Sequence, residues 1–229
     1  MTTNLPIDLF DLGRMAYRDA LDWQQTKAAE VRSETSADAL ALLEHPPVYT
    51  MGARGGDDHM LLSEDDLRER GADLIVTDRG GDMTFHGPGQ LVLYAVLNLR
   101  RRSLRPVDHV RCLERTILQT LSALGLRGGT VKGRPGVWIG SRKIAAIGVS
   151  IRGGATMHGA ALNVTNDLTW FNAIVPCGLH GLGVTSMARE LENAPPMDCV
   201  LDAAVAAFSE AYEANVRPAA PLVEPVCGL

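Results

Sequence analysis

The amino-acid sequence predicts an α+β fold, in which strands pair through hairpins while helices lie near the start, the middle and the end of the chain. Strand-like segments follow one another directly over residues 72–99 and 136–164. This order differs from the regular alternation of strands and helices that is typical of a doubly wound parallel sheet. The 229 residues, 46% of them hydrophobic, can bury the core of one large domain or two small ones.

In the first half of the chain, the pattern of apolar residues predicts two helices and three strands. Residues 13–32 carry apolar side chains at helical spacing, and residues 39–45 read as a buried strand that a proline pair ends. Ser63 and the acidic residues after it form a capping box that opens a short helix. Residues 72–78 and 90–99, rich in β-branched and aliphatic side chains, predict strands on either side of a glycine-dense loop.

The second half contains the clearest helix of the sequence, over residues 106–124, where the apolar side chains fall three or four positions apart. Residues 136–151 then predict a β-hairpin that turns at Gly140. A further strand is expected over residues 158–164, and a last helix over residues 198–215.

Charge and hydropathy exclude several classes of function. The formal charge of -5 argues against binding to nucleic acid or another polyanion. No apolar stretch is long enough to span a bilayer, and residues 1–14 lack the basic start and apolar run of a secretory signal. We therefore expect a cytoplasmic protein with neither a nucleic-acid nor a membrane partner.

The four cysteines favour one reactive thiol over a zinc site, because no C-x-x-C pair occurs. Cys112 and Cys199 lie in helical patterns, as small core residues do, and Cys227 is misplaced for a prenylation box. Cys177, between a proline and a glycine, could stand on a sharp turn beside backbone donors that hold an oxyanion. The alternative is an unreactive loop cysteine.

The densest polar loop is the segment 79–90, RGGDMTFHGPGQ. Its glycines and prolines let the backbone approach a ligand closely, and Arg79, Thr84, His86 and Gln90 supply hydrogen-bond donors. The segment lacks the P-loop pattern and precedes a strand rather than a helix. A wide hairpin turn with a surface histidine remains the alternative.

Lys143 stands among small apolar residues on the return strand of the predicted hairpin. Desolvation there would lower the lysine pKa and make a neutral amine base accessible, whereas an outward lysine on an edge strand is the alternative. His86, His158 and Cys177 could be drawn as a three-ligand metal site, but their spacing does not support one. We therefore expect no metal.

Taken in this order, these segments resemble the lipoyl(octanoyl) transferase family. Residues 79–94 match its signature R-G-G-x-x-T-aromatic-H-x-x-G-Q-x-x-x-Y throughout. The segments K-I-A-x-[IL]-G, H-G-x-A-L-N and P-C-G…G-V-T-S follow at residues 143–148, 158–163 and 176–186. The resemblance spans most of the chain, and the combination is far more specific than any one segment.

The resemblance implies a fold similar to the catalytic domain of biotin and lipoate ligases, an α+β sandwich around a mixed sheet. We expect one such domain over residues 1–216. Residues 217–229, rich in proline and alanine, are predicted to be a mobile tail.

The resemblance also implies a cofactor-independent acyltransferase with a catalytic dyad of Cys177 and Lys143. The implied reaction moves an octanoyl group from octanoyl-acyl carrier protein, through a cysteine thioester, to a lysine of a lipoyl domain. The acceptors would be the lipoyl domains of 2-oxoacid dehydrogenase complexes and the glycine cleavage H protein, and the reaction would begin endogenous protein lipoylation.

Small side chains and backbone donors are expected to line the acyl pocket. The implied substrate-binding residues are Arg79, Gly80, Gly81, Asp82, Met83, Thr84, Phe85, His86, Ala146, Ile147, Gly148, Gly159, Ala160 and Ala161. Ala160 stands where the family often has a bulkier residue and Ala146 where it often has serine, which predicts a roomier pocket.

Other functions are weighed against this one. An ATP-dependent lipoate or biotin ligase shares the fold but needs no cysteine nucleophile, and a non-catalytic carrier-binding module would form no covalent adduct. A cysteine hydrolase would need a Cys–His–Asn/Asp set, which does not emerge from the sequence.

The arginines between residues 100 and 111 form a separate basic cluster in an acidic protein. We hypothesise that this cluster steers an acidic carrier protein to the enzyme, and a solvated entry to the helix is the alternative.

Overall fold

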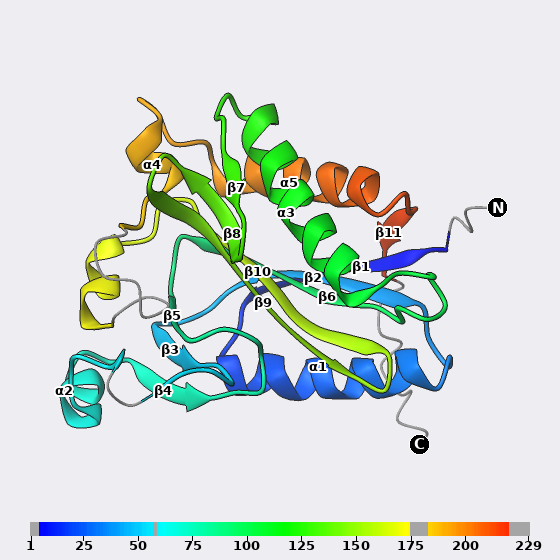
Figure 1. The fold of residues 1–229 in the computed structure, drawn as a ribbon, viewed down its shortest axis with the longest axis horizontal. Coiled ribbons are helices and arrows are strands. Elements are labelled where there is room, and N and C mark those ends of the chain that lie inside the picture. Colours follow the sequence, from blue (N-terminus) through cyan, green and yellow to red (C-terminus); the bar gives the residue numbers. More distant parts are fainter. Residues whose placement is uncertain (1–4, 57–58, 175–182, 220–229) are drawn as a thin grey trace, which may run out of the picture.

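The computed structural model describes residues 5–56, 59–174 and 183–219, which form an α+β fold with two sheets (Figure 1). The main sheet has eight strands in the order β11-β1-β2-β6-β10-β9-β8-β7. Their bounds are β1 Ile7–Arg14, β2 Asp38–Glu44, β6 Gln90–Val96, β7 Gly129–Val131, β8 Arg134–Ile139, β9 Arg142–Arg152, β10 Ala155–Asn163 and β11 Val216–Pro218. The sheet is mixed, because β11, β1 and β2 run parallel while every pair from β2 to β7 is antiparallel.

The central strand β6 is buried on both faces, so helices must cover the sheet on either side. Leu91, Leu93 and Ala95 belong to a core with helices α3 (Pro106–Ala123) and α5 (Met197–Ala211). The alternate side chains of β6 meet α1 (Tyr17–Arg32) on the opposite face. Figure 1 shows α3 and α5 above the sheet and α1 below it.

A smaller sheet lies beside the main one, with β3 (Val48–Met51) between β4 (Asp73–Val76) and β5 (Met83–His86). Its core is aromatic: the Phe85 ring stacks on Trp170 of the 3-10 helix η2 (Leu168–Ala173), with centroids 5.1 Å apart. The short helices α2 (Glu64–Glu69) and α4 (Met187–Glu190) complete the described elements. Ser63 caps α2 with the predicted capping box. No helix among the described residues is long and apolar enough to cross a membrane.

The predicted α+β class is confirmed, and so are the hairpin and its turn, where Gly140 takes a φ of +58°. The first helix begins at Tyr17, four residues later than predicted, because strand β1 occupies the preceding residues. Strand β1 shows no polar–apolar alternation, since Ile7 and Leu9 face the α3–α5 core while Phe10 and Leu12 face α1. The predicted glycine-dense loop likewise contains a strand, β5.

The predicted domain boundary after residue 216 falls inside strand β11, which pairs with β1 through Pro218. Residues 220–229 of the predicted tail lie outside the described residues.

Two arginines of the predicted basic cluster bind a buried carboxylate. Asp38, at the start of β2, is inaccessible to solvent and contacts Arg101 Nη2 at 2.5 Å and Arg102 Nε. Arg105 and Arg111 pair instead with Asp108 on α3. Arg101 and Arg102 therefore tie the loop before α3 to the centre of the sheet, and the carrier-docking hypothesis gains no support from their geometry.

Replacement of Asp38 by asparagine should destabilise the protein strongly. Asp38→Asn would leave the guanidinium of Arg102 buried without a counter-charge, and breaking a buried pair in this way costs about 3–5 kcal/mol. Urea denaturation would measure the loss. The control Asp8→Asn removes a partly exposed pair with Arg217 and should cost about 0–1 kcal/mol. An equal loss in both variants would contradict the structural role of Asp38.

Candidate active site

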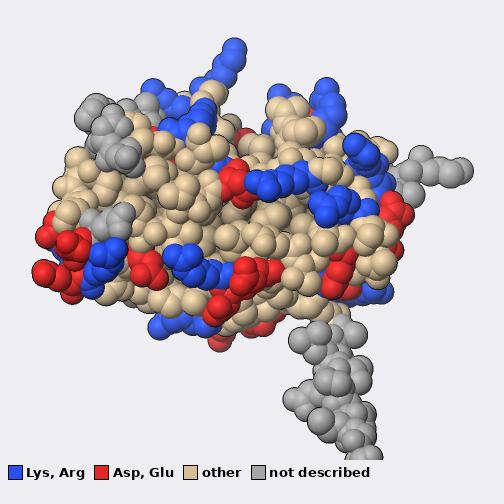
Figure 2. Space-filling model, turned by 90° about the horizontal axis from the view of Figure 1, so that it is seen from below, with Lys and Arg blue, Asp and Glu red and all other residues tan. Residues whose placement is uncertain are grey.

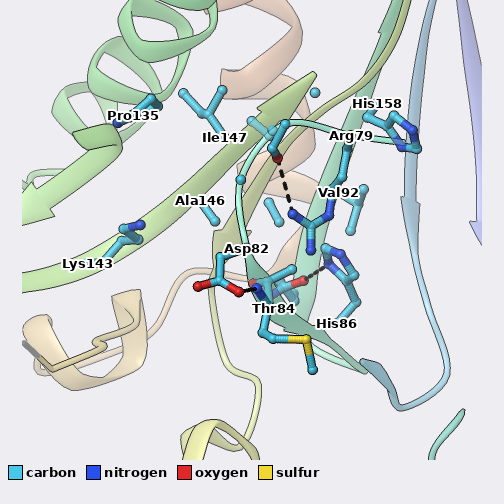
Figure 3. Close-up of a pocket in the computed structure, with 18 of the residues that line it drawn as sticks. Arg79, Asp82, Thr84, His86, Val92, Pro135, Lys143, Ala146, Ile147 and His158 are labelled. Atoms are coloured by element: carbon cyan, nitrogen blue, oxygen red, sulfur yellow. Dashed lines mark hydrogen bonds between the residues drawn. The ribbon is translucent and has the colours of Figure 1, made fainter. Parts of the chain in front are cut away.

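A cavity of about 470 Å³ opens between the main sheet and the loop that carries residues 79–86. Its volume lies in the range of small-molecule sites. Strands β6, β9 and β10 form one wall, the loop and β5 form another, and the β7–β8 turn contributes to its border. Figure 3 shows Arg79, Asp82, Thr84 and His86 on one side and Lys143, Ala146 and Ile147 on β9.

The guanidinium of Arg79 fixes the loop to the small sheet. Its Nη2 donates to the backbone oxygen of Thr50 at 2.6 Å, and Nη2 and Nε both donate to the Thr50 hydroxyl, at 2.8 and 3.1 Å. A buried guanidinium needs such acceptors, because an unsatisfied charged group in the interior is costly. The main role of Arg79 is therefore to hold its own loop in position.

Glycine backbone fixes the other side of the same loop to β9. The amide of Gly80 donates to the carbonyl of Val149 at 2.9 Å. A Cβ at Gly148 would lie 2.7 Å from the carbonyl oxygen of Gly80, a contact that real side chains do not make. Glycine at residue 148 thus allows the two backbones to touch, so the cavity wall is made of main-chain atoms.

His86 is held neutral at the bottom of the cavity. Gln90 Nε2 donates to the carbonyl of Phe85, which turns Gln90 Oε1 toward His86 Nδ1 at 2.7 Å. The Nδ1 atom must then carry the proton, and Nε2 is an acceptor. Burial, with the nearby His45 as a second cause, holds the pKa of His86 well below its usual value.

A second neutral hydrogen-bonded pair, His45 and Tyr94, lies beside His86, with the His45 and His86 ring centroids 5.7 Å apart. His45 Nδ1 lies 2.7 Å from the backbone oxygen of Met15 and therefore donates, so Nε2 accepts from the Tyr94 hydroxyl at 2.7 Å. Burial lowers the pKa of His45 to about 4 and raises the pKa of Tyr17 to about 12. These histidine and tyrosine side chains are therefore polar but uncharged at neutral pH, and Arg79 is the charged side chain near them.

His158 is held in place by contacts of both its backbone and its side chain. Its backbone takes a φ of +62°, which is rare for a residue with a side chain, and its amide donates to Gln24 Oε1 at 2.6 Å. Its Nε2 lies 3.0 Å from Asp78 Oδ1. Burial lowers the pKa of His158, although Asp78 opposes the shift. The described residues contain no group of three side chains that could hold a metal, and Cys177 of the metal alternative lies outside them.

Lys143 lies on an interior strand, because β9 pairs with β10 on one side and β8 on the other. The edge-strand alternative is therefore wrong. Its Nζ lies 4.9 Å from the centroid of the Trp138 ring, and the side chain is half-buried at the cavity. The Lys143 amide donates to Gly183 and its carbonyl accepts from Thr185, both at 2.9 Å, so the segment 183–185 runs along β9.

Thirteen of the fourteen residues predicted to bind substrate line the cavity, and Phe85 does not. Phe85 packs in the core of the small sheet, because neighbouring residues on β5 face opposite sides. Cys177 lies outside the described residues. Sequence reasoning missed Tyr17 and Arg54, which line the cavity from segments far away in the chain and carried no motif signal.

Comparison with known proteins agrees with this geometry. Residues 16–209 match the family model described as the lipoyl protein ligase A/B catalytic domain. An octanoyltransferase of Solibacter usitatus is 44% identical over 214 residues, covering 93% of this chain and 96% of that protein. An octanoyltransferase of Myxococcus xanthus is 42% identical over 223 residues, and the match covers 94% of this chain but 62% of that longer protein.

Solved structures show the same fold at lower identity. A bi-partite lipoate protein ligase from Thermoplasma acidophilum superposes with a TM-score of 0.73 at 18% identity, covering 94% of this chain and 87% of that one. At this identity the likeness concerns the fold alone.

A single methyl group on β9 should disable the site. Gly148→Ala would push the backbone of Gly80 away from β9 and displace the loop, so we expect activity to fall at least about tenfold, since small misplacements at a reacting centre can cost a hundredfold. The control Gly129→Ala adds a methyl group where no atom lies within 4 Å and should keep full activity. Normal activity in Gly148→Ala would refute the close-contact argument.

Stability should fall as the pH drops from 6.5 toward 4. The lowered pKa of His45 means that the unfolded chain binds a proton which the folded protein resists, so the stabilisation is present above pH 6.5 and lost below it. A folded pKa of about 4 corresponds to about 2 kcal/mol lost between pH 7 and pH 5. Urea denaturation at both pH values should show a shallower pH dependence for His45→Asn, and an unchanged slope would exclude His45 as a source.

Proposed function

The chain belongs to the octanoyltransferase family, and from this premise we propose that it carries an octanoyl group from octanoyl-acyl carrier protein to a lysine of a lipoyl domain through a thioester on Cys177. The observation that carries the proposal is the cavity, whose β9–β10 wall has small residues at 146, 148 and 159–161 and has Lys143 at its side. Segment 183–185, which follows Cys177 in the chain after a few residues, pairs with the backbone of Lys143. This pairing supports a partnership between the two residues.

In the first half-reaction the Cys177 thiolate attacks the carbonyl carbon of the octanoyl thioester. A new C–S bond forms, the old C–S bond breaks, and the phosphopantetheine thiol leaves with a proton. Exchange of one thioester for another is nearly balanced in free energy, so ATP is not required. A charged Lys143 would favour the thiolate, and a neutral Lys143 would accept the thiol proton.

In the second half-reaction the amine of the acceptor lysine attacks the Cys177 thioester. A C–N bond forms and the C–S bond breaks, which leaves an amide and the cysteine sulfur. The acceptor enters as an ammonium and loses two protons in all, one of which returns to the sulfur. Lys143 is the proposed acceptor of the other, and proton transfer of this kind is typically worth about 10²–10⁴-fold in rate.

The surface around the cavity supports an acidic carrier as the donor substrate. Arg54, Lys132 and Arg134 are exposed at or next to the cavity mouth, and none of them forms an ion pair within the described part of the chain. Figure 2 shows Lys and Arg along the upper edge of the face seen from below, and others among the Asp and Glu of its lower half. Opposite charge of this kind speeds encounter between partners. Transfer to lipoyl domains of 2-oxoacid dehydrogenases or glycine cleavage H protein, and a cytoplasmic location, stay predictions.

The ATP-dependent ligase is the weaker alternative. It is favoured by the description of the family model and by the fold, at 18% identity, whereas the transferase relatives are 42–44% identical over most of the chain. A ligase would also leave the P-C-G segment around Cys177 without a role.

Intact-protein mass spectrometry tests the proposal. The protein is mixed with octanoyl-acyl carrier protein alone, and we expect one octanoyl group on the wild type and none on Cys177→Ser. Lys143→Ala should slow acylation at least about a hundredfold, because proton transfer is worth that much. A wild-type protein that gains mass only when ATP is added would place the chain among the ligases. An adduct that persists in Cys177→Ser would refute the assignment of the nucleophile.

A further inference from the structure

The charges around the cavity are unequal, because Asp82 is the one carboxylate among the described residues that line it. Cationic side chains of Arg54, Arg79, Arg134 and Lys143 share the same lining. Asp82 is buried, with 8% of its surface exposed, and it stands just before β5 on the wall that faces β9. An eight-carbon chain offers this carboxylate neither a donor nor a positive charge, so binding of the acyl group does not explain Asp82.

Two contacts hold the Asp82 carboxylate in place. The amide of Met83 donates to Oδ1 at 2.7 Å, and His59 Nδ1 lies 2.7 Å from Oδ2. An ionised carboxylate has about four acceptor sites, so two such contacts leave capacity for another donor. Figure 3 shows the Asp82 carboxylate and the Lys143 amine extending toward the same space from opposite walls.

The acceptor lysine, which is the second substrate, supplies a positive charge that can pair with the Asp82 carboxylate. A lysine side chain in water has a pKa near 10.4 and therefore enters the site as an ammonium. Four cationic side chains in the lining would repel it, and a desolvated ammonium needs a counter-charge. The Asp82 carboxylate is the group in the described lining that can provide one.

We propose that Asp82, held by His59, is the binding and positioning group for the ammonium of the acceptor lysine. The inference rests on the proposed function. Asp82 holds the ammonium beside the thioester, the proton leaves toward Lys143 or solvent, and the neutral amine then attacks the carbonyl carbon. The C–N bond forms, the C–S bond breaks, and the second amine proton goes to the sulfur.

This role predicts a specific kinetic signature. A carboxylate that binds the ammonium also favours its protonated form, so it strengthens acceptor binding more than it speeds the attack. Asp82→Asn should therefore raise the KM for the lipoyl domain about tenfold or more, as expected for the loss of a charged hydrogen bond, with a smaller change in kcat. Asp82→Glu keeps the charge and should recover part of the affinity.

The experiment separates the two half-reactions. Each variant is first octanoylated with octanoyl-acyl carrier protein, and the decay of the acyl-enzyme is then followed by mass spectrometry with either a lipoyl domain or hydroxylamine. Hydroxylamine is a neutral nucleophile at pH 7. We expect Asp82→Asn to slow transfer to the lipoyl domain at limiting concentration about tenfold, and transfer to hydroxylamine much less. Asp65→Asn on α2, an exposed carboxylate remote from the cavity lining, is the matched control and should behave as the wild type.

Three outcomes would overturn the inference. Equal slowing with both nucleophiles would show that Asp82 only supports the loop, and a wild-type KM in Asp82→Asn would show that it does not meet the acceptor. If Asp82→Asn fails to fold, Asp82→Glu is measured instead. The inference is wrong if the KM of Asp82→Glu for the lipoyl domain changes in parallel with its rate of transfer to hydroxylamine. A wild-type protein that takes up no octanoyl group overturns the proposed function, and this inference with it.

Discussion

The geometry of the site depends on the attachment of one loop to two sheets. Arg79 binds Thr50 in the small sheet, and the next residue, Gly80, binds Val149 in the main sheet. Adjacent residues thus connect two layers whose strands do not pair with each other. Because the guanidinium is satisfied by oxygen atoms of buried Thr50, a cation can lie in the interior at the point where the layers meet. The small sheet thereby becomes a wall of the cavity.

The cavity has two chemically different ends. At one end His86 bonds to Gln90, and Tyr94 bonds to His45 behind the lining; these side chains are uncharged at neutral pH, because burial suppresses ionisation, and Arg79 is the charged group near them. Lys143, Asp82 and the exposed arginines provide charge at the other side. An alkyl chain can lie against the uncharged side chains of this end, because the Arg79 guanidinium there is already bonded to Thr50, while the reacting atoms remain near groups that bind or move protons. The division between the two ends thus matches an apolar acyl group joined to a polar reaction centre.

The sequence predicted those helices and strands whose apolar residues recur at a uniform spacing. Helix α3, the β8–β9 hairpin and the double-faced strand β6 follow directly from their patterns of apolar residues. Strand β1 escaped prediction because both of its faces are apolar and its register shifts between Asp11 and Arg14. The division into two sheets was not predicted either, since it depends on β3 pairing with β4 and β5 instead of with the main sheet, which no local pattern encodes.

For the site, the family resemblance named a loop and a lysine that both lie at the cavity, whereas Phe85 packs in the small-sheet core, because strand β5 turns its side chain that way. Tyr17 comes from another segment, and tertiary packing alone brings it to the cavity, with the His45 ring packed behind it. The glycine at residue 148 has a further consequence for the evolution of acyl-chain length. Together with Ala146, Gly159, Ala160 and Ala161 it gives the β9–β10 wall a set of small residues, where substitution can add atoms but has little to remove. Enlarging one of the alanines would reduce the space for an acyl chain, whereas Gly148 cannot be enlarged without displacing the Gly80 loop. Along this wall, substitution therefore narrows the range of acyl chains more easily than it widens it.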